Sequence, residues 1–116
     1  LNTSNPLCYY SDYYVYKMLE IFEKEDTEIR FLIHPGLMNL YLYDQEKGTD
    51  FLNTLQEYLK NPGQSSLVAK NLHVHKNTLL YRMGKIKELI GSDLTQGDDY
   101  MNMNLSLMIM KYLNML

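Results

Sequence analysis

Apolar residues recur with the period of an α-helix in the second half of the chain. They stand at i, i+4, i+7 and i+11 and therefore form one stripe along a helix. The members of this stripe are Leu79, Met83, Ile86 and Ile90. A shorter run with helical character comes before it, and a few residues separate the two. The pattern predicts a short helix, a tight turn and a longer helix over residues 65–91, which is the layout of a helix-turn-helix.

Three features of the shorter helix and the turn fit this layout. The hydroxyl of Ser65 or Ser66 can cap the shorter helix, because it can accept a hydrogen bond from the unpaired amides of the first turn. Ala69 provides the small side chain that two steeply crossing helices need where they come closest. Leu72 and Val74 flank the turn, and we expect them to fill the gap between the helices.

The side of the longer helix opposite its apolar stripe is mostly polar. At about 100° per residue, this side and its two flanks carry Asn77, Thr78, Leu80, Tyr81, Gly84 and Lys85. Asn77 can form a bidentate pair with adenine, and Lys76 can contact a phosphate. Tyr81 can contact the DNA backbone or a base, and Leu80 can meet a thymine methyl group. This side therefore suits a DNA groove.

The remaining segments are predicted to be helical as well. Residues 1–10 are the exception, because Asn5-Pro6 marks irregular backbone, and we expect a linker or disordered tail there. The expected helices lie at 11–25, 27–33, 35–47, 49–61 and 100–116. Together they predict an all-α fold, a bundle of about six helices with a Fis-like, wing-free helix-turn-helix. Residues 11–116 then form one DNA-binding domain.

Caps and turn residues set the expected helix ends. Thr27 and Thr49 can cap the helices that follow them. Pro35 suits the first turn of its helix, and Gly48 can end that helix. Asp44 shares a face with apolar residues, so we expect it to cap or hydrogen-bond a neighbouring helix end.

The last expected helix is rich in methionine and apolar nearly all round, which predicts that it is buried. Its methionines are Met101, Met103, Met108, Met110 and Met115. Methionine fills irregular gaps in a core and also forms adaptable partner surfaces. The sequence leaves open whether this helix packs in the domain's own core or against a second copy.

The charge distribution favours a nucleic-acid partner, although the chain carries −3 overall. Between residues 60 and 92 there are six basic residues against Glu88 alone, a local balance of +5, so the remainder carries −8. The local potential governs contact with phosphates, because screening limits charge interactions to about 8–10 Å. The acidic remainder weakens non-specific binding without removing the basic face.

Other classes of function find little support in the sequence. The single cysteine, Cys8, excludes an internal disulfide framework and suits a reducing cytoplasm. His73 and His75 lack the further ligands that a metal site needs, and no phosphate-binding loop or nucleophile motif is present. No signal peptide or membrane-spanning run is visible. We therefore expect no enzyme, no metal and no cofactor. Because the chain begins without Met, we also expect it to be part of a longer protein.

Several separated motifs together resemble one family. They are Tyr16-Lys17-Met18-Leu19, His34-Pro35-x-Leu37, Tyr43-Asp44, Gly48-Thr49-x-x-Leu52-x-Thr54-Leu55-x-x-Tyr58-Leu59 and Leu72-x-Val74-His75-Lys76-Asn77-Thr78-Leu79-x-Tyr81-Arg82. In this order they resemble the C-terminal helix-turn-helix domain of PucR-type bacterial transcription regulators, which include purine-catabolism and sugar-diacid regulators. The resemblance extends from about residue 12 to the end.

The chain departs from the usual pattern at two positions. The family more often has a polar or basic residue where this chain has Gly84. Two explanations remain open: the glycine lets a DNA backbone or a partner approach closely, or it is merely tolerated in the helix. His73 stands where helix-turn-helix turns often have glycine. The role of Arg82 is also open, because its side chain can pair with a carboxylate or reach a phosphate.

The resemblance implies sequence-specific binding of double-stranded DNA, as the output domain of a cytoplasmic bacterial transcription regulator. The helix from Lys76 would enter the major groove. Side chains expected at base edges are Lys76, Asn77, Leu80 and Tyr81. Those expected along the DNA backbone are Ser65, Ser66, His75, Thr78, Arg82 and Lys85.

We expect a homodimer on paired half-sites, because one module contacts few base pairs, and sensory domains upstream in the same chain. No contact with a membrane is expected. The alternative is a helical protein-interaction or dimerisation module that does not bind DNA, with the methionine-rich helix as its working surface.

Overall fold

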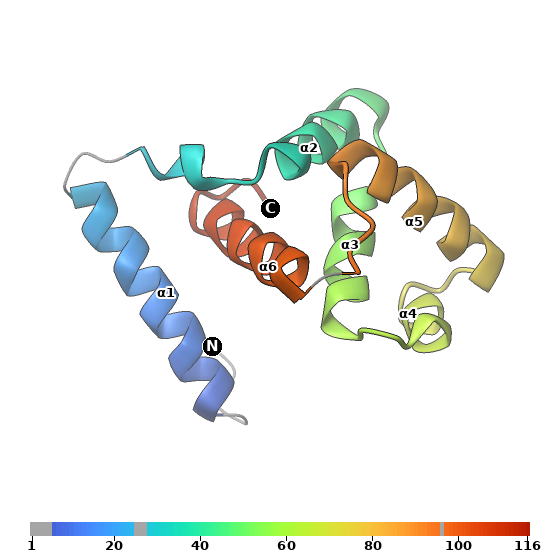
Figure 1. The fold of residues 1–116 in the computed structure, drawn as a ribbon, viewed down its shortest axis with the longest axis horizontal. Helices are drawn as coiled ribbons and strands as arrows, with labels where there is room; N and C mark the ends of the chain where they lie inside the picture. Colours follow the sequence, from blue (N-terminus) through green and yellow to red (C-terminus); the bar gives the residue numbers. More distant parts are fainter. Residues whose placement is uncertain (1–5, 25–27, 96) are drawn as a thin grey trace. The chain divides into compact units, whose positions relative to one another are not determined.

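The structure is a computed structural model, and it describes residues 6–24, 28–95 and 97–116. Every regular element in these residues is a helix, so the predicted all-α fold with about six helices is confirmed (Figure 1). The elements are α1 (Pro6–Lys24), the 3₁₀ helix η1 (Ile29–Leu32), α2 (Pro35–Lys47), α3 (Phe51–Lys60), α4 (Ser65–Asn71), α5 (Lys76–Ile90) and α6 (Gly97–Tyr112).

The chain divides into two compact units. Residues 34–104 form what we call the helix-turn-helix unit, which contains α2 to α5 and the beginning of α6. The terminal unit is made of residues 1–33 and 105–116, and its described part contains α1, η1 and the end of α6. The candidate DNA-contacting residues all belong to the helix-turn-helix unit.

Helix α5 is the central element of the helix-turn-helix unit. It packs on α2, α3 and α4, and Figure 1 shows α4 near its N-terminal end. The four residues of its predicted apolar stripe are all buried: Leu79, Met83, Ile86 and Ile90. Their neighbours in the core include Leu37 and Leu40 of α2, Leu55 of α3, and Val68 and Ala69 of α4, which are also buried. The predicted stripe is therefore confirmed. Ala69 is buried, and its place at the closest approach of the two helices stays a prediction.

The two ends of α2 follow from local sequence. Pro35 occupies its first turn, and the preceding His34 accepts a hydrogen bond on Nδ1 from the amide of Gly36, at 2.9 Å. Gly48 ends the helix with φ 69°, a conformation that side chains with a Cβ rarely adopt. The predicted roles of Pro35 and Gly48 are thus confirmed.

Gly36 lies where α2 meets the end of α5. A Cβ atom added to Gly36 would stand 2.8 Å or less from backbone atoms of Ile90, which is closer than carbon atoms can approach. Glycine at this position therefore lets the two helices come together, and it brings the C-terminal end of α5 against the start of α2.

Asp44 provides the cap of α3, as the sequence analysis expects of a carboxylate on an apolar face. Its Oδ1 accepts from the amide of Phe51 at 3.0 Å and its Oδ2 from the amide of Leu52 at 2.9 Å. The hydroxyl of Thr49 also donates to Asp44 Oδ1. The prediction that Thr49 itself caps α3 is wrong, because α3 begins one residue later and its N-cap is Asp50, which makes no side-chain cap bond.

The N-terminal helix begins earlier than the sequence analysis places it. Helix α1 starts at Pro6, although residues 1–10 were expected to be a linker and 11–25 the helix. A proline can occupy the first turn of a helix, where its missing N–H is no loss, and Asn5-Pro6 therefore marks a helix start. Residues 1–5 and the expected cap Thr27 lie outside the described residues. The division of the chain into a tail and a domain at residue 10 stays a prediction.

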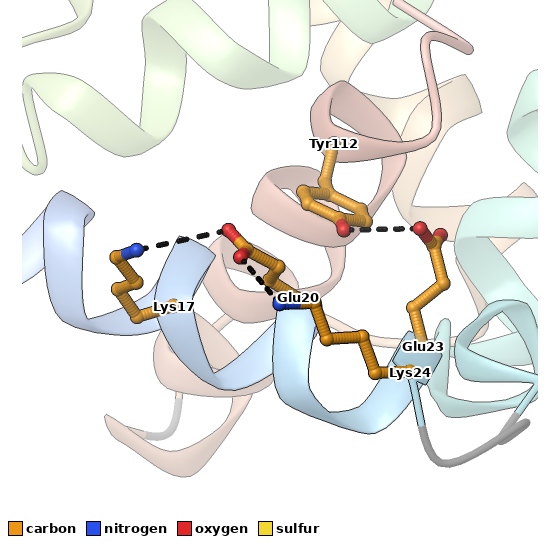
Figure 2. A network of polar contacts seen from close by, with 5 residues as sticks. All are labelled: Lys17, Glu20, Glu23, Lys24 and Tyr112. Carbon is orange, nitrogen blue, oxygen red and sulfur yellow. Dashed lines mark hydrogen bonds and ion pairs between the residues drawn. The ribbon is translucent and has the colours of Figure 1, made fainter.

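Polar contacts in the terminal unit join residues of α1 to one another and join α1 to the end of α6 (Figure 2). Glu20 pairs with Lys17 at 3.9 Å and with Lys24 at 3.3 Å, and the Tyr112 hydroxyl donates to Glu23 at 3.3 Å. Burial, and after it the nearby carboxylate of Glu23, raises the pKa of the Tyr112 phenol above its ordinary value, so this hydroxyl remains a donor at neutral pH. The ion pairs are exposed and contribute little stability.

The last helix differs from its prediction in extent and in burial. Helix α6 runs from Gly97 to Tyr112, whereas a helix over 100–116 was expected, and Asn114 follows it with φ 63°. One side of the helix is buried: Met103, Ser106, Leu107, Ile109 and Met110. Met101 is 67% exposed and Leu105 40% exposed, so the expectation of a helix buried nearly all round is wrong on that side.

We predict opposite effects for alanine at two glycines of the helix-turn-helix unit. Gly36→Ala should lower the free energy of unfolding by about 2–3 kcal/mol, because the new methyl group overlaps the backbone at Ile90. Gly84→Ala should raise it by up to about 1 kcal/mol, because Gly84 lies inside α5 with nothing within 4 Å of the added Cβ. Urea unfolding followed by circular dichroism measures both. Equal effects at the two positions would contradict the close approach at Gly36.

We also predict that Asp44→Ala lowers the free energy of unfolding by about 2 kcal/mol, since it leaves the amides of Phe51 and Leu52 without their acceptor. The matched control is Asp50→Ala. It removes the same charge near the same helix end, but the Asp50 carboxylate bonds only to the exposed side chain of Asn53. The control should cost at most about 1 kcal/mol, and urea unfolding of both variants distinguishes the two roles.

Candidate nucleic-acid interface

The turn between α4 and α5 is closed by two backbone hydrogen bonds around His73. The amide of His73 donates to the carbonyl of Lys70 at 3.1 Å, and the amide of Val74 donates to the carbonyl of Ala69 at 3.0 Å. His73 has φ 57°, so it adopts the left-handed conformation that glycine usually provides at such a helix end. The turn is therefore tight without glycine. Leu72 and Val74 are half-buried beside it, as expected of residues that fill the gap.

His75 caps the N-terminus of α5. Its backbone is extended (φ −68°, ψ 149°), and its Nδ1 accepts a hydrogen bond from the amide of Asn77 at 3.0 Å. Because Nδ1 is the acceptor, the ring proton of the neutral imidazole is on Nε2. The His75 side chain is exposed, so this N–H is available to an acceptor outside the protein. One ring nitrogen of His75 thus caps α5 while the other faces solvent.

The beginning of α4 differs from its prediction. The N-cap is Gln64, whose carbonyl accepts from the amide of Val68 at 3.0 Å, and no side chain caps this end. Ser65 and Ser66 are the first two residues of the helix itself. Both therefore come after the N-cap position. The prediction that one of them caps α4 is therefore wrong.

A surface hollow joins the first turn of α4 to the first residue of α5. It is lined by Gly63, Gln64, Ser65, Ser66, Leu67 and Lys76. The structure thus brings together three residues that the sequence analysis selected, the two serines and Lys76. It adds Gln64 and Leu67, which are exposed and which the helical pattern alone did not single out.

The outward side of α5 is exposed along its first two turns. Leu80 is 55% exposed and Tyr81 72% exposed, and the other exposed residues are Lys76, Asn77, Thr78 and Gly84. Arg82 and Lys85 are half-buried. From the helical angles, Lys76 and Leu80 lie on one flank of the outward side, while Thr78, Arg82 and Lys85 lie on the other. The eight predicted contacts from His75 to Lys85 therefore all reach the surface.

The basic residues of this region are not neutralised by the carboxylates that the structure describes. Ion pairs among the described residues involve Lys17, Lys24, Arg30 and Lys47, all of which lie outside residues 60–92. The Glu57 carboxylate, which lies just before this region, accepts hydrogen bonds from Asn61 and Asn71. The positive charge predicted for residues 60–92 is thus exposed or half-exposed and open to an anionic partner.

Two lysines of α5 lie over tyrosine rings from neighbouring helices. The ammonium nitrogen of Lys85 is 5.9 Å from the ring centroid of Tyr43 in α2, and that of Lys87 is 5.8 Å from the ring centroid of Tyr58 in α3. Both distances lie within the range of a cation–π interaction. Neither tyrosine was selected from the sequence as a site residue, because the contacts with Lys85 and Lys87 join segments that are 42 and 29 positions apart.

The tyrosine under Lys87 has a second phenol beside it. Burial first, and then the neighbouring hydroxyl of Tyr58, raises the pKa of Tyr100 above its ordinary value. The Tyr100 phenol is therefore neutral at physiological pH and adds no negative charge beside Lys87.

The described residues offer no other chemistry. No three His, Cys, Asp or Glu side chains among them come together as a set that could hold a metal ion. No described helix combines the length and the apolar character that a membrane crossing requires. What the arrangement can do is donate hydrogen bonds and present positive charge along one side of α5.

Comparison with known proteins gives matches of one kind. A profile of the family described as "PucR C-terminal helix-turn-helix domain" matches residues 51–109. The proline-responsive transcriptional activator PutR of Bacillus subtilis (strain 168) is 33% identical over 97 residues, which are 84% of this chain and 23% of PutR. The purine catabolism regulatory protein of the same organism is 36% identical over 70 residues, 60% of this chain and 13% of that protein. This chain thus spans less than a quarter of either relative, and no solved structure gives a significant match.

We predict that His75→Ala lowers the free energy of unfolding by about 1 kcal/mol, because the amide of Asn77 loses its acceptor. His75→Asn should retain most of the stability, since asparagine is a good N-cap residue. Urea unfolding compares the two variants with the wild-type chain. A loss for His75→Asn as large as that for His75→Ala would contradict the capping role.

Proposed function

The chain belongs to the family of PucR C-terminal helix-turn-helix domains, the DNA-binding output domains of transcription regulators, and we propose that it binds double-stranded DNA in a sequence-specific manner. The observation that carries this proposal is the outward side of α5. It is polar, exposed and without carboxylate partners among the described residues, while the opposite side is buried. The whole protein would be a bacterial regulator of transcription that acts in the cytoplasm.

In this proposal the N-terminal half of α5 enters the major groove and contacts base edges. Asn77 would form the bidentate pair with adenine, and Lys76 would donate to a base edge beside it. Leu80 would contact a thymine methyl group, and Tyr81 a base or the adjacent backbone. Their exposure supports these roles, because none of the four needs to move out of the core to reach the DNA.

The remaining selected residues would set the position on the sugar-phosphate backbone. The Nε2–H of His75 would donate to a phosphate while Nδ1 continues to cap α5. Thr78, Arg82 and Lys85 would contact one strand from their common flank. The hydroxyls of Ser65 and Ser66 lie in the hollow beside Lys76, and they would contact the other strand.

We further propose that the protein acts as a homodimer and carries its sensory domains outside this segment. One recognition helix contacts only a few base pairs, and two half-sites about 34–36 Å apart multiply the specificity. Room for additional domains follows from the relatives, which are more than four times as long as the segments they share with this chain. The role proposed for the chain is binding and includes no catalytic step.

The proposed function predicts different effects for a base contact and a phosphate contact. Asn77→Ala should lower the discrimination at one base pair by about 1–3 kcal/mol, whereas Lys85→Ala should weaken binding to all sequences alike. Lys85→Ala should also reduce the slope of log K against log salt by about 0.9. Binding constants are measured by fluorescence anisotropy, on duplexes selected from a genomic library and on single-base variants of them. Lys111→Ala, which removes an exposed lysine from the terminal unit, is the charge-matched control and should change neither quantity.

Two results would count against the proposal. If Asn77→Ala and Lys85→Ala weaken every duplex equally, Asn77 is not a base contact. If the chain binds no duplex at low salt but still associates with itself, it is a protein-interaction or dimerisation module, and the exposed residues Met101 and Leu105 of α6 would then be the first surface to test.

A further inference from the structure

We propose that Tyr43 is a positioning residue for DNA binding, because its ring holds the ammonium group of Lys85 at the flank of α5 where a phosphate would meet it. The inference rests on the proposed function and adds a residue that itself touches no DNA. In this inference Lys85 contacts a phosphate of the duplex backbone, and that contact does not depend on the base sequence.

The position of the Tyr43 ring is fixed by the beginning of α3. The ring stacks on that of Phe51, with centroids 5.5 Å apart and planes inclined by 7°. Phe51 is buried, and its amide donates to the carboxylate of Asp44, the residue next to Tyr43. The stack and the cap therefore tie Tyr43 to the core. Lys85 then lies with its ammonium nitrogen 5.9 Å from a ring that cannot easily move.

The charge of Lys85 is not used inside the protein. No described carboxylate pairs with it, and the nearest candidate in the sequence of α2, Asp44, already accepts three hydrogen bonds, from the Thr49 hydroxyl and from the amides of Phe51 and Leu52. A ring attracts the ammonium group without neutralising its charge. Lys85 thus keeps its full attraction for a phosphate.

Holding a lysine in place strengthens its later contacts. A free lysine side chain loses rotamer freedom when it is immobilised at an interface, and a side chain that is already ordered loses less. From the part of this ordering cost that a side chain held in place avoids, we expect Tyr43 to improve affinity about two- to fivefold. Tyr43 should not change the number of phosphates contacted, because Lys85 can still reach its phosphate when the ring is absent.

The pair of Lys87 and Tyr58 provides a matched control. Its geometry is nearly the same, at 5.8 Å. Lys87, however, lies in the last turn of α5, beyond the N-terminal half that is proposed to enter the groove, and it lines a surface hollow together with Glu88 and Asp93. The carboxylates of this hollow weaken its attraction for a phosphate, so we expect it to make no contact with DNA.

The test is a double-mutant cycle on the full chain with Tyr43→Leu, Lys85→Ala and the double variant. The probes are a duplex selected from a genomic library and a duplex of scrambled sequence, each titrated at several salt concentrations.

Tyr43→Leu should weaken binding to both duplexes two- to fivefold and leave the salt slope unchanged. Lys85→Ala should reduce the slope by about 0.9. In the Lys85→Ala background, Tyr43→Leu should have no further effect. Tyr43→Phe, which keeps the ring, should bind like the wild type.

The same measurements can overturn the inference. If Tyr43→Leu lowers DNA affinity equally with and without Lys85, the tyrosine acts only through the fold. If Tyr43→Phe lowers affinity as much as Tyr43→Leu does, the aromatic ring is not the cause. The cycle with Tyr58→Leu and Lys87→Ala should leave affinity and slope unchanged. A coupling as large as that of Tyr43 and Lys85 would overturn the assignment of the phosphate contact to Lys85. If the wild-type chain binds neither duplex, the proposed function itself fails.

Discussion

Burial of one apolar stripe fixes the orientation of α5, and the rest of the interface depends on that orientation. Leu79, Met83 and Ile86 can leave water together only when one side of the helix faces α2, α3 and α4. Rotating the helix by a single residue would expose part of the stripe and bury charged groups, at a cost of several kcal/mol. The polar side is therefore exposed because the apolar side is buried. Neither Asn77 nor Tyr81 needs a contact of its own to be held outward.

Signals that are local in the sequence predicted much of the fold. The spacing of the α5 stripe, proline at position 35 and glycine at position 48 were sufficient to locate α2 and α5, since each acts through neighbours within a few residues. The starts of α1, α4 and α6 were predicted less well: α1 begins at Pro6 and α6 at Gly97, both earlier than expected, and the N-cap of α4 is Gln64 where a serine hydroxyl was expected. A helix that is held by packing does not require a good cap.

Contacts between distant segments account for what the sequence did not reveal about the candidate site. The hollow shared by α4 and α5 and the tyrosines under Lys85 and Lys87 each join residues from different helices. Their partners depend on how the helices cross, which helical periodicity does not determine. Asp44 was recognised as a capping residue because a carboxylate on an apolar face must find donors, but the identity of those donors, at Phe51 and Leu52, needed the structure.

The shortness of α4 has a consequence for how this region opens. A helix of seven residues does not persist alone in water, so α4 exists only while Val68 and Ala69 are docked in the core. Its hydrogen-bonded amides from Val68 onward and those of the turn at His73 and Val74 therefore exchange with solvent deuterons only when that docking is lost. Local opening that releases α4 also removes the hollow next to Lys76. The packing of α4 and the surface formed by α4 and Lys76 are therefore lost together, as one cooperative unit.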